Sequence, residues 1–528
     1  MARRAEPLGG PATLGGGAVA ALLVLVIFGS LAAVAWRAEE GARFSAADWA
    51  ALRFTLTQAA LSALISVALA VPVARALARR QFRGRGVLIT LLGAPFILPT
   101  IVAVLGLLAV FGRNGLLSTA LGWLGLPPVQ IYGLHGVVIA HVFFNMPLAT
   151  RLLLQGWLAI PAERFRLAAA LDFGPRDVMR QLEWPMLREM VPGVVLVIFL
   201  ICLTSFAVAL TLGGGPRATT VELAIYQAFR FDFDLTRAAM LALVQFGLCA
   251  VAAIAVYRIT VPAGMGSGLD RPLARWDAGA ASLKVQDGVV LTAAALFLLA
   301  PLSMIVLGGV AGLPGLPASV WIAALRSIAV ALGATALVIT MGLALALAVV
   351  RLEARGRSGG GAAIEGLGMV SLAASPLVIG TGLFILIFPW ADPARLALPV
   401  TALVNAVMAL PFALRAILPA LRQAESGYGS LADSLGMTGW SRLRYMLLPR
   451  LRRPVGFAAG LAAALSMGDL GVIVLFAGGD AATLPLQLYR LMGAYRMADA
   501  AGAALLLLGL SLTLFWVFDR GGRGRAGT

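Results

Sequence analysis

Residues 430–449, SLADSLGMTGWSRLRYMLLP, form a polar, arginine-bearing stretch in a chain that is otherwise mostly apolar. A related stretch, RLAAALDFGPRDVMRQLEWP, occupies residues 166–185, and a constant shift of 264 positions relates the two. The shift carries Pro147, Arg151, Leu171 and Pro185 onto Pro411, Arg415, Leu435 and Pro449. A repeat at one fixed offset indicates that the chain consists of two equivalent halves.

Each copy of this stretch contains a turn of small residues followed by a proline. Gly436 suits the left-handed residue that ends many helices. Aspartate tolerates the same geometry at Asp172, and a turn shifted towards Gly174, two positions on, is the alternative in the first copy. Thirteen positions later come Pro449 and Pro185, which lack a backbone N–H and therefore fit the first turn of a following helix. The alanines in the small-residue turn leave a smooth surface that another protein can approach closely. We therefore predict that both loops dock on a partner.

The composition places the chain in the membrane class, because 60% of its residues are hydrophobic and only 12% are charged. The net charge of +17 does not indicate nucleic-acid binding, because no basic run is interleaved with aromatic residues. The arginines lie instead in short loops beside apolar segments, which is the pattern of the positive-inside rule.

The residue types that carry covalent or metal chemistry are scarce. Lys284 is the only lysine, and its neighbours do not form a phosphate-binding loop, so the chain carries no such ATPase of its own. Cys202 and Cys249 both fall in predicted spans, which argues against a disulfide framework or a cysteine metal site. His135 and His141 lie six positions apart, so packing or polar roles are expected for them. We predict no catalytic, cofactor-binding or metal-binding residue.

About twelve apolar segments are long enough to span a membrane. They lie near residues 17–36, 52–74, 87–111, 133–158, 190–212, 237–257, 288–310, 320–350, 363–388, 397–421, 454–476 and 498–518. No small-residue cleavage site clearly follows the first segment, so we expect a retained helix and not a signal peptide.

The arginine-rich loops, including both polar stretches, fall on the side of the N-terminus when twelve spans are counted. By the positive-inside rule that side is the cytoplasm, with both termini inside. A Gly-, Pro- and charge-rich linker at 259–287 separates the halves 1–258 and 288–528. The halves are parallel, because an even number of spans separates equivalent loops. Polar external loops are expected at 213–236 and 478–497.

The repeated loops resemble the cytoplasmic-loop signature of importer-type ABC permeases, E-A-A-x3-G-x9-I-x-L-P. In that family the loop forms a short coupling helix that lies in a cleft of the ATPase subunit. The signature glutamate is Arg166 in one copy and Ser430 in the other, and its glycine is Asp172 in the first copy. The resemblance implies coupling loops at about 159–189 and 422–453. The implied coupling residues are Ala168, Ala169, Asp172, Gly174, Pro185, Ala432, Leu435, Gly436 and Pro449.

Longer passages resemble the thiamine ABC transporter permeases. They are HVFFNMPLATRLLLQ at 141–155, LGGGPRATTVELAIYQA at 212–228, RAAMLALVQ at 237–245 and LSMGDLGVIVLF at 465–476. The passage at 212–228 favours thiamine over ferric iron, whose fused permeases share this architecture and size. The resemblance implies an all-α polytopic membrane protein with the type I ABC importer permease fold, in two parallel six-helix repeats.

The implied function is a translocation subunit for thiamine and its phosphate esters that works by alternating access. Its partners would be a periplasmic binding protein, two copies of an ATPase subunit and the lipid bilayer, with no cofactor. A ferric-iron or other small-solute ABC importer is the main alternative. An ion-coupled secondary transporter is the distant alternative, and such a protein should show midplane charges and broken helices in both halves. A membrane enzyme would need a convergent polar site.

Asp469 is the only acidic residue deep within a predicted span, and the shift of 264 pairs it with Ser205. An acidic side chain costs about 2.5–3.5 kcal/mol at the centre of a membrane helix, so Asp469 is not expected to face lipid. We predict that both residues line the translocation path, where a carboxylate would offset the lost hydration of the thiamine cation. A structural role, as a backbone hydrogen-bond acceptor or part of a gate, is the alternative for Asp469.

In the first external loop, Arg217, Thr219 and Glu222 are predicted to contact the binding protein. A merely solvated role for the two charged residues is equally compatible with the sequence.

Overall fold

The computed structural model describes residues 10–38, 44–93, 95, 97–213, 215, 218–259, 275–478 and 481–523. Over these residues the chain forms helices and no β-strand, which confirms the all-α polytopic fold. Ten helical segments in this part of the chain are long and apolar enough to cross a membrane. The predicted count of twelve is therefore not confirmed.

The helices of the first half are α1 (Gly10–Val24), α2 (Ser30–Ala38), α3 (Ala46–Arg79), α4 (Arg85–Leu91), α5 (Thr100–Phe111), α6 (Leu116–Trp123), α7 (Leu134–Ala159), α8 (Ala162–Ala170), α9 (Pro175–Val178), α10 (Trp184–Leu203), α11 (Phe206–Leu212), α12 (Val221–Arg230) and α13 (Leu235–Ile259). Those of the second half are α14 (Ala281–Gly312), α15 (Ala318–Ala354), α16 (Ser358–Met369), α17 (Pro376–Ile387), α18 (Ala397–Ser434), α19 (Gly439–Ser441), α20 (Leu448–Met467), α21 (Ile473–Phe476), α22 (Leu484–Gly493) and α23 (Met497–Gly522).

Two pairs of predicted spans are interrupted at corresponding places in the halves. The spans expected at 87–111 and 363–388 are α4 with α5 and α16 with α17. α5 starts directly after Pro99, and α17 starts at Pro376. Proline lacks a backbone N–H, so it is tolerated at a helix start and disfavoured in a helix interior. The spans expected at 190–212 and 454–476 are α10 with α11 and α20 with α21.

The first helices of the two halves are exchanged. α1 packs on α15 and α2 on α17 of the second half, whereas α14 packs on α3 and α5 of the first; α2 and α14 also pack on α13 and α23 of their own halves. Glycine allows these close approaches, since a methyl group added at Gly16 would overlap Ala348, and one added at Gly106 would lie 2.6 Å from the carbonyl oxygen of Pro301. The first helices of each half therefore pack against helices of the other half.

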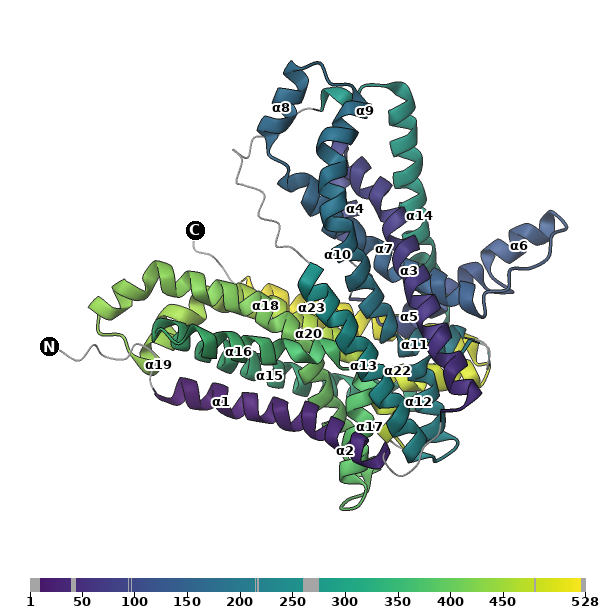
Figure 1. Cartoon of the computed structure of the whole chain (residues 1–528). Helices are drawn as coiled ribbons and strands as arrows, with labels where there is room; N and C mark the ends of the chain where they lie inside the picture. Colours follow the sequence, from purple (N-terminus) through teal and green to yellow (C-terminus); the bar gives the residue numbers. More distant parts are fainter. Residues whose placement is uncertain are drawn as a thin grey trace.

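The long helices, α1 and α14 among them, form two arms that diverge from a common base (Figure 1). α8 and α9 lie at the tip of one arm, and α19 lies at the end of the other. The base is formed by shorter elements, which include α11, α12, α17 and α22. The two polar loops therefore lie far from the place where the halves meet.

Candidate functional site

The two polar loops end their first helices with the same backbone turn. Asp172 has a φ of 55°, and the N–H of the next residue donates to the carbonyl of Ala168 at 3.0 Å. At the equivalent place Gly436 has a φ of 65°, and the following N–H donates to the carbonyl of Ala432 at 2.9 Å. Both are Schellman turns, in which a left-handed residue lets two N–H groups satisfy the last carbonyls of the helix. The predicted left-handed geometry is confirmed in both copies.

The second helix of each loop also starts in the same way. The backbone N–H of Gly174 donates to the Asp177 carboxylate at 3.1 Å, and that of Thr438 donates to the Ser441 hydroxyl at 3.2 Å. A π-turn follows in each copy, at Met179–Glu183 and at Arg442–Leu447.

The predicted prolines follow these π-turns. Pro185 and Pro449 lie in the first turns of α10 and α20, as predicted. However, α10 and α20 are continuous through the π-turns with the short α9 and α19, so the second helix of each loop starts earlier than the sequence suggested.

Of the alanines expected to form the exposed surface of the loops, Ala169 and Ala170 are exposed and Ala168 and Ala432 are not; the large exposed side chains are leucines. Ala168 and Ala432 are each only 2% exposed, because their helix face is turned towards the protein. Leu167 and Leu171 are more than half exposed, as are their equivalents, Leu431 and Leu435. Residues four apart share one helix face, so each loop presents a pair of neighbouring leucines. Leu167, Leu171 and Leu431 were missed, although their repetition at the shift of 264 was a usable signal.

The end of the linker holds the first loop. The Arg275 guanidinium lies 4.5 Å from the ring centroid of Phe165 in α8 and pairs with Glu183 at 3.0 Å. The Trp276 indole N–H donates to the carbonyl of Phe173, directly after the left-handed turn, at 3.1 Å. Burial by itself raises the pKa of the neighbouring Asp277, but the hydrogen bond and charge of Arg275 outweigh it and hold that pKa below its ordinary value. The rest of the linker, 260–274, lies outside the described residues.

The second loop is held by its own charges. Pro161, which separates α7 from α8, is replaced at the shift of 264 by Glu425, so α18 continues unbroken into the loop. The side chain of Arg442 is 3% exposed and pairs with both Glu425 and Asp433. The two loops therefore have the same backbone conformation at the turn, but linker contacts stabilise the first loop and ion pairs of Arg442 stabilise the second.

A cavity of about 340 Å³ lies between the halves, where the broken helices meet. The break between α10 and α11 contributes Thr204 and Ser205, and the break between α20 and α21 contributes Gly468 and Asp469. Residues at the starts of α5 and α17 and residues of α7 and α12 also line it. Broken helices at matching places in two repeats commonly form the substrate sites of transporters.

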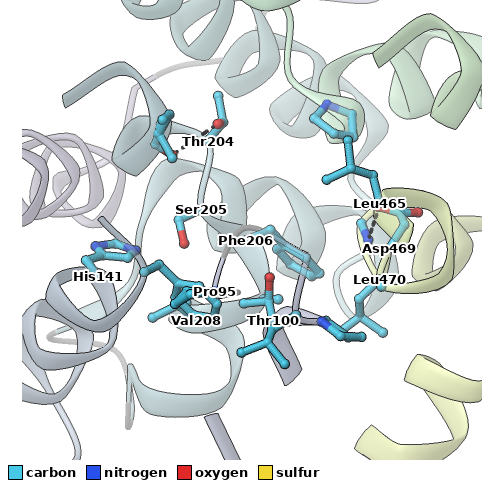
Figure 2. Close-up of a pocket in the computed structure, with 18 of the residues that line it drawn as sticks. Pro95, Thr100, His141, Thr204, Ser205, Phe206, Val208, Leu465, Asp469 and Leu470 are labelled. Carbon is cyan, nitrogen blue, oxygen red and sulfur yellow. Dashed lines mark hydrogen bonds between the residues drawn. The ribbon is translucent and has the colours of Figure 1, made fainter. Parts of the chain in front are cut away.

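The two residues predicted to line the path, Ser205 and Asp469, both line this cavity and lie on either side of it (Figure 2). One carboxylate oxygen of Asp469 accepts the N–H of Gly471 at 3.2 Å, and the other is buried with no hydrogen-bond partner. The predicted pair is thus brought together at one site.

The residues predicted to contact a binding protein are placed differently. Arg217 lies outside the described residues, Thr219 is buried, and Glu222 is 0% exposed. The Thr220 hydroxyl caps α12 by accepting the N–H of Leu223 at 3.2 Å, so the helix begins here and its first turn faces inward. The prediction of surface contacts through Thr219 and Glu222 is therefore wrong for this conformation. Glu222 lies instead in the wall of the cavity.

A second cavity, of about 420 Å³, adjoins the first and shares Ile97, Phe144 and Leu148 with it. Its wall includes Arg151 and Arg415, which the shift of 264 relates to each other. The interface between the halves therefore carries carboxylates in one cavity and guanidinium groups in the next.

Curated relatives cover almost the whole chain. The thiamine transport system permease protein ThiP of Brucella abortus (strain 2308) is 40% identical over 534 residues, which cover 99% of this chain and 98% of the relative. ThiP of Escherichia coli (strain K12) is 40% identical over 536 residues, with 98% of each chain covered. The molybdenum transport system permease protein ModB of Azotobacter vinelandii is 28% identical over 178 residues, 34% of this chain and 78% of the relative.

No protein-family model matches the chain. The two ThiP relatives cover nearly its entire length at 40% identity, and the all-α fold with ten apolar helices in the described residues is that of a multi-pass inner-membrane ABC permease. The chain belongs to the family of thiamine transport system permease proteins.

Proposed function

We propose that this chain is the membrane subunit of an ATP-driven importer that carries thiamine into the bacterial cytoplasm. The observation that carries the proposal is the full-length similarity to permeases named for thiamine transport, at 40% identity over 98–99% of the chain. Broken helices in both halves also occur in ion-coupled secondary transporters. The choice between the two classes therefore rests on the family and on the two loops.

Each loop is proposed to bind one copy of a separate ATPase subunit, which hydrolyses the ATP. The exposed leucine pair of each loop is the apolar surface that such a subunit would cover. Asp172 and Gly436 form the left-handed turns of the two loops, and the carbonyl of Ala169 accepts the N–H of Asp172 at 3.1 Å. With both termini and both loops in the cytoplasm, a periplasmic binding protein would dock at the opposite end, near α12 and α22.

The proposed mechanism is alternating access. The loops lie at the ends of diverging arms, and the cavity lies where the arms meet (Figure 1). Closure of the ATPase dimer on ATP would draw the loops together, rotate the halves and open the cavity to the outside. Hydrolysis would release the loops and return the cavity to the cytoplasmic side.

The chain is also proposed to carry phosphate esters of thiamine. Arg151 and Arg415 face the space next to the carboxylate-bearing cavity, and guanidinium groups bind phosphate well. The cationic ring of such an ester would lie near the carboxylates of the first cavity, and its anionic phosphate would lie near the guanidinium groups of the second.

The proposal is tested by uptake of labelled thiamine and of ferric iron in cells that carry the complete system. Thiamine uptake should be saturable, should not be inhibited by ferric iron, and should persist when an ionophore collapses the proton gradient while ATP is maintained. The chain should also co-purify with an ATPase subunit. Uptake of ferric iron without uptake of thiamine would overturn the assignment of thiamine as the substrate. Loss of thiamine uptake when only the proton gradient is collapsed would overturn the assignment to the ATP-driven class.

A further inference from the structure

Three side chains in the wall of the first cavity carry buried polar atoms without a hydrogen-bond partner. These atoms are Nε2 of His141, both carboxylate oxygens of Glu222 and one carboxylate oxygen of Asp469. Buried polar groups in proteins are nearly always paired, so such a group calls for a physical explanation. Three of them around one cavity indicate a ligand that supplies the missing partners.

Glu222 is the most strongly constrained of the three. It lies in the first turn of α12, is 0% exposed, and has no basic partner within the described part of the chain. Ser375 and Gln245 approach its carboxylate closely enough to interact with it, but both side chains are neutral and neither meets the geometry of a hydrogen bond. The amide N–H of Gln245 already donates to the carbonyl of Leu203 at 2.8 Å, at the end of α10. A carboxylate in such a place is costly unless a cation reaches it.

Asp469 approaches the cavity from the second half. Its hydrogen bond to Gly471 fixes the carboxylate in the break between α20 and α21 and leaves the second oxygen free. The Asn405 amide also approaches this carboxylate, but the hydrogen bond that it donates goes to the Ser466 hydroxyl at 3.0 Å. The two carboxylates therefore belong to different halves. Glu222 is held by the short helix α12, and Asp469 is held by the break between α20 and α21.

The cavity also fits the size and shape of a small ring compound. Its volume of about 340 Å³ lies at the lower end of the range for ligand pockets. Phe144 and Phe206 line it beside the polar groups, and aromatic rings pack well against a flat heterocycle. The polar ring nitrogen of His141 offers one further hydrogen bond (Figure 2).

We propose that this cavity is a binding site for an organic monocation, in which Glu222 of the first half and Asp469 of the second half provide the counter-charge. The inference rests on the proposed function, since the thiazolium ring of thiamine is such a cation, and it adds the residues and the charge class of the site. Because each half contributes one carboxylate, movement of the halves changes the distance between the charges. Affinity for the cation therefore depends on the conformation that ATP selects.

The test uses the complete complex of permease, ATPase and binding protein in proteoliposomes. Initial uptake rates are measured for labelled thiamine and for its neutral isostere, in which carbon replaces the charged ring nitrogen. Glu222→Gln and Asp469→Asn should each lower thiamine uptake by about tenfold or more through a higher KM, because a desolvated ion pair is lost. Uptake of the neutral isostere should change little, so the preference for the cation should disappear. Glu189→Gln is the control, because it removes an exposed carboxylate from α10 outside the cavity.

Glu222→Asp separates charge from packing. It keeps the carboxylate and should retain a preference for the cation, whereas Glu222→Gln keeps the size and should lose it. Equal preference for the cation in wild type, Glu222→Gln and Asp469→Asn would overturn the inference while leaving thiamine transport intact. The same holds if Glu222→Asp behaves as Glu222→Gln does. Failure of the wild-type complex to transport thiamine would instead overturn the proposed function.

Discussion

Replacing Gly436 with valine should uncouple the second loop from ATP hydrolysis. Gly436 has a φ of 65°, and a Cβ added there would meet no atom within 4 Å. The cost is therefore one of backbone conformation alone, about 1–2 kcal/mol for a residue with a Cβ in left-handed geometry. That energy changes the population of the correctly formed turn by about 5- to 30-fold. The exposed Leu431 and Leu435, which lie at the end of the helix before the turn, would then be misplaced relative to the ATPase.

The equivalent residue of the first loop supplies the matched control. Asp172 adopts a φ of 55° at the same place, so Gly436→Asp should preserve the turn and most of the transport. Uptake of thiamine and ATP hydrolysis stimulated by the binding protein are measured on the same assembled complexes. We expect uptake to fall in Gly436→Val, with the permease still inserted and the ATPase bound more weakly or uncoupled. Normal uptake in Gly436→Val, or equal loss in Gly436→Val and Gly436→Asp, would refute the reasoning.

Three other substitutions test separate parts of the structure. Leu435→Asp places a charge on a side chain that is 67% exposed, so the fold should persist while co-purification with the ATPase decreases. Arg442→Gln leaves the partly buried Glu425 without its cation and should destabilise the second loop by up to about 3 kcal/mol, seen as faster proteolysis of the loop. The exposed Arg444→Gln is its control, and equal proteolysis of the two variants would contradict the assignment. Arg151→Gln should reduce uptake of thiamine phosphate more than uptake of free thiamine. An equal decrease for the two compounds would refute the proposal that Arg151 binds the phosphate group.

The local features of the loops were predictable, because they depend on individual residues. A left-handed turn at Gly436 follows from the lack of a Cβ, and the same turn at Asp172 follows from the tolerance of aspartate. Which helix face is exposed depends on neighbours distant in sequence, so the burial of Ala168 and the exposure of Leu167 were not predicted. The positions of the polar loops can be predicted from the sequence, but the residues that form their exposed surface cannot.

The cavity was predicted only in part. Asp469 and Ser205 were found because an isolated acidic residue in an apolar segment and the shift of 264 both indicate them. Glu222 was assigned to an external loop, because residues 213–236 form one of the longest polar segments expected outside the membrane and carry the family-like passage. The cap at Thr220 starts a helix that turns this residue inward, and hydropathy alone does not register such a short helix. Apolar runs likewise conceal the helix breaks at Ser205 and Gly468.

The contacts of Arg275 and Trp276 with the first loop bear on whether the two halves need a covalent connection. In a chain opened between Ile259 and Arg275, these contacts would remain on the second fragment together with α14, which packs on α3 and α5. The first fragment would keep α1 and α2, which pack on α15 and α17. Each fragment would therefore hold part of the other through buried surface. Two separately translated polypeptides have the contacts they need to reassemble into one permease.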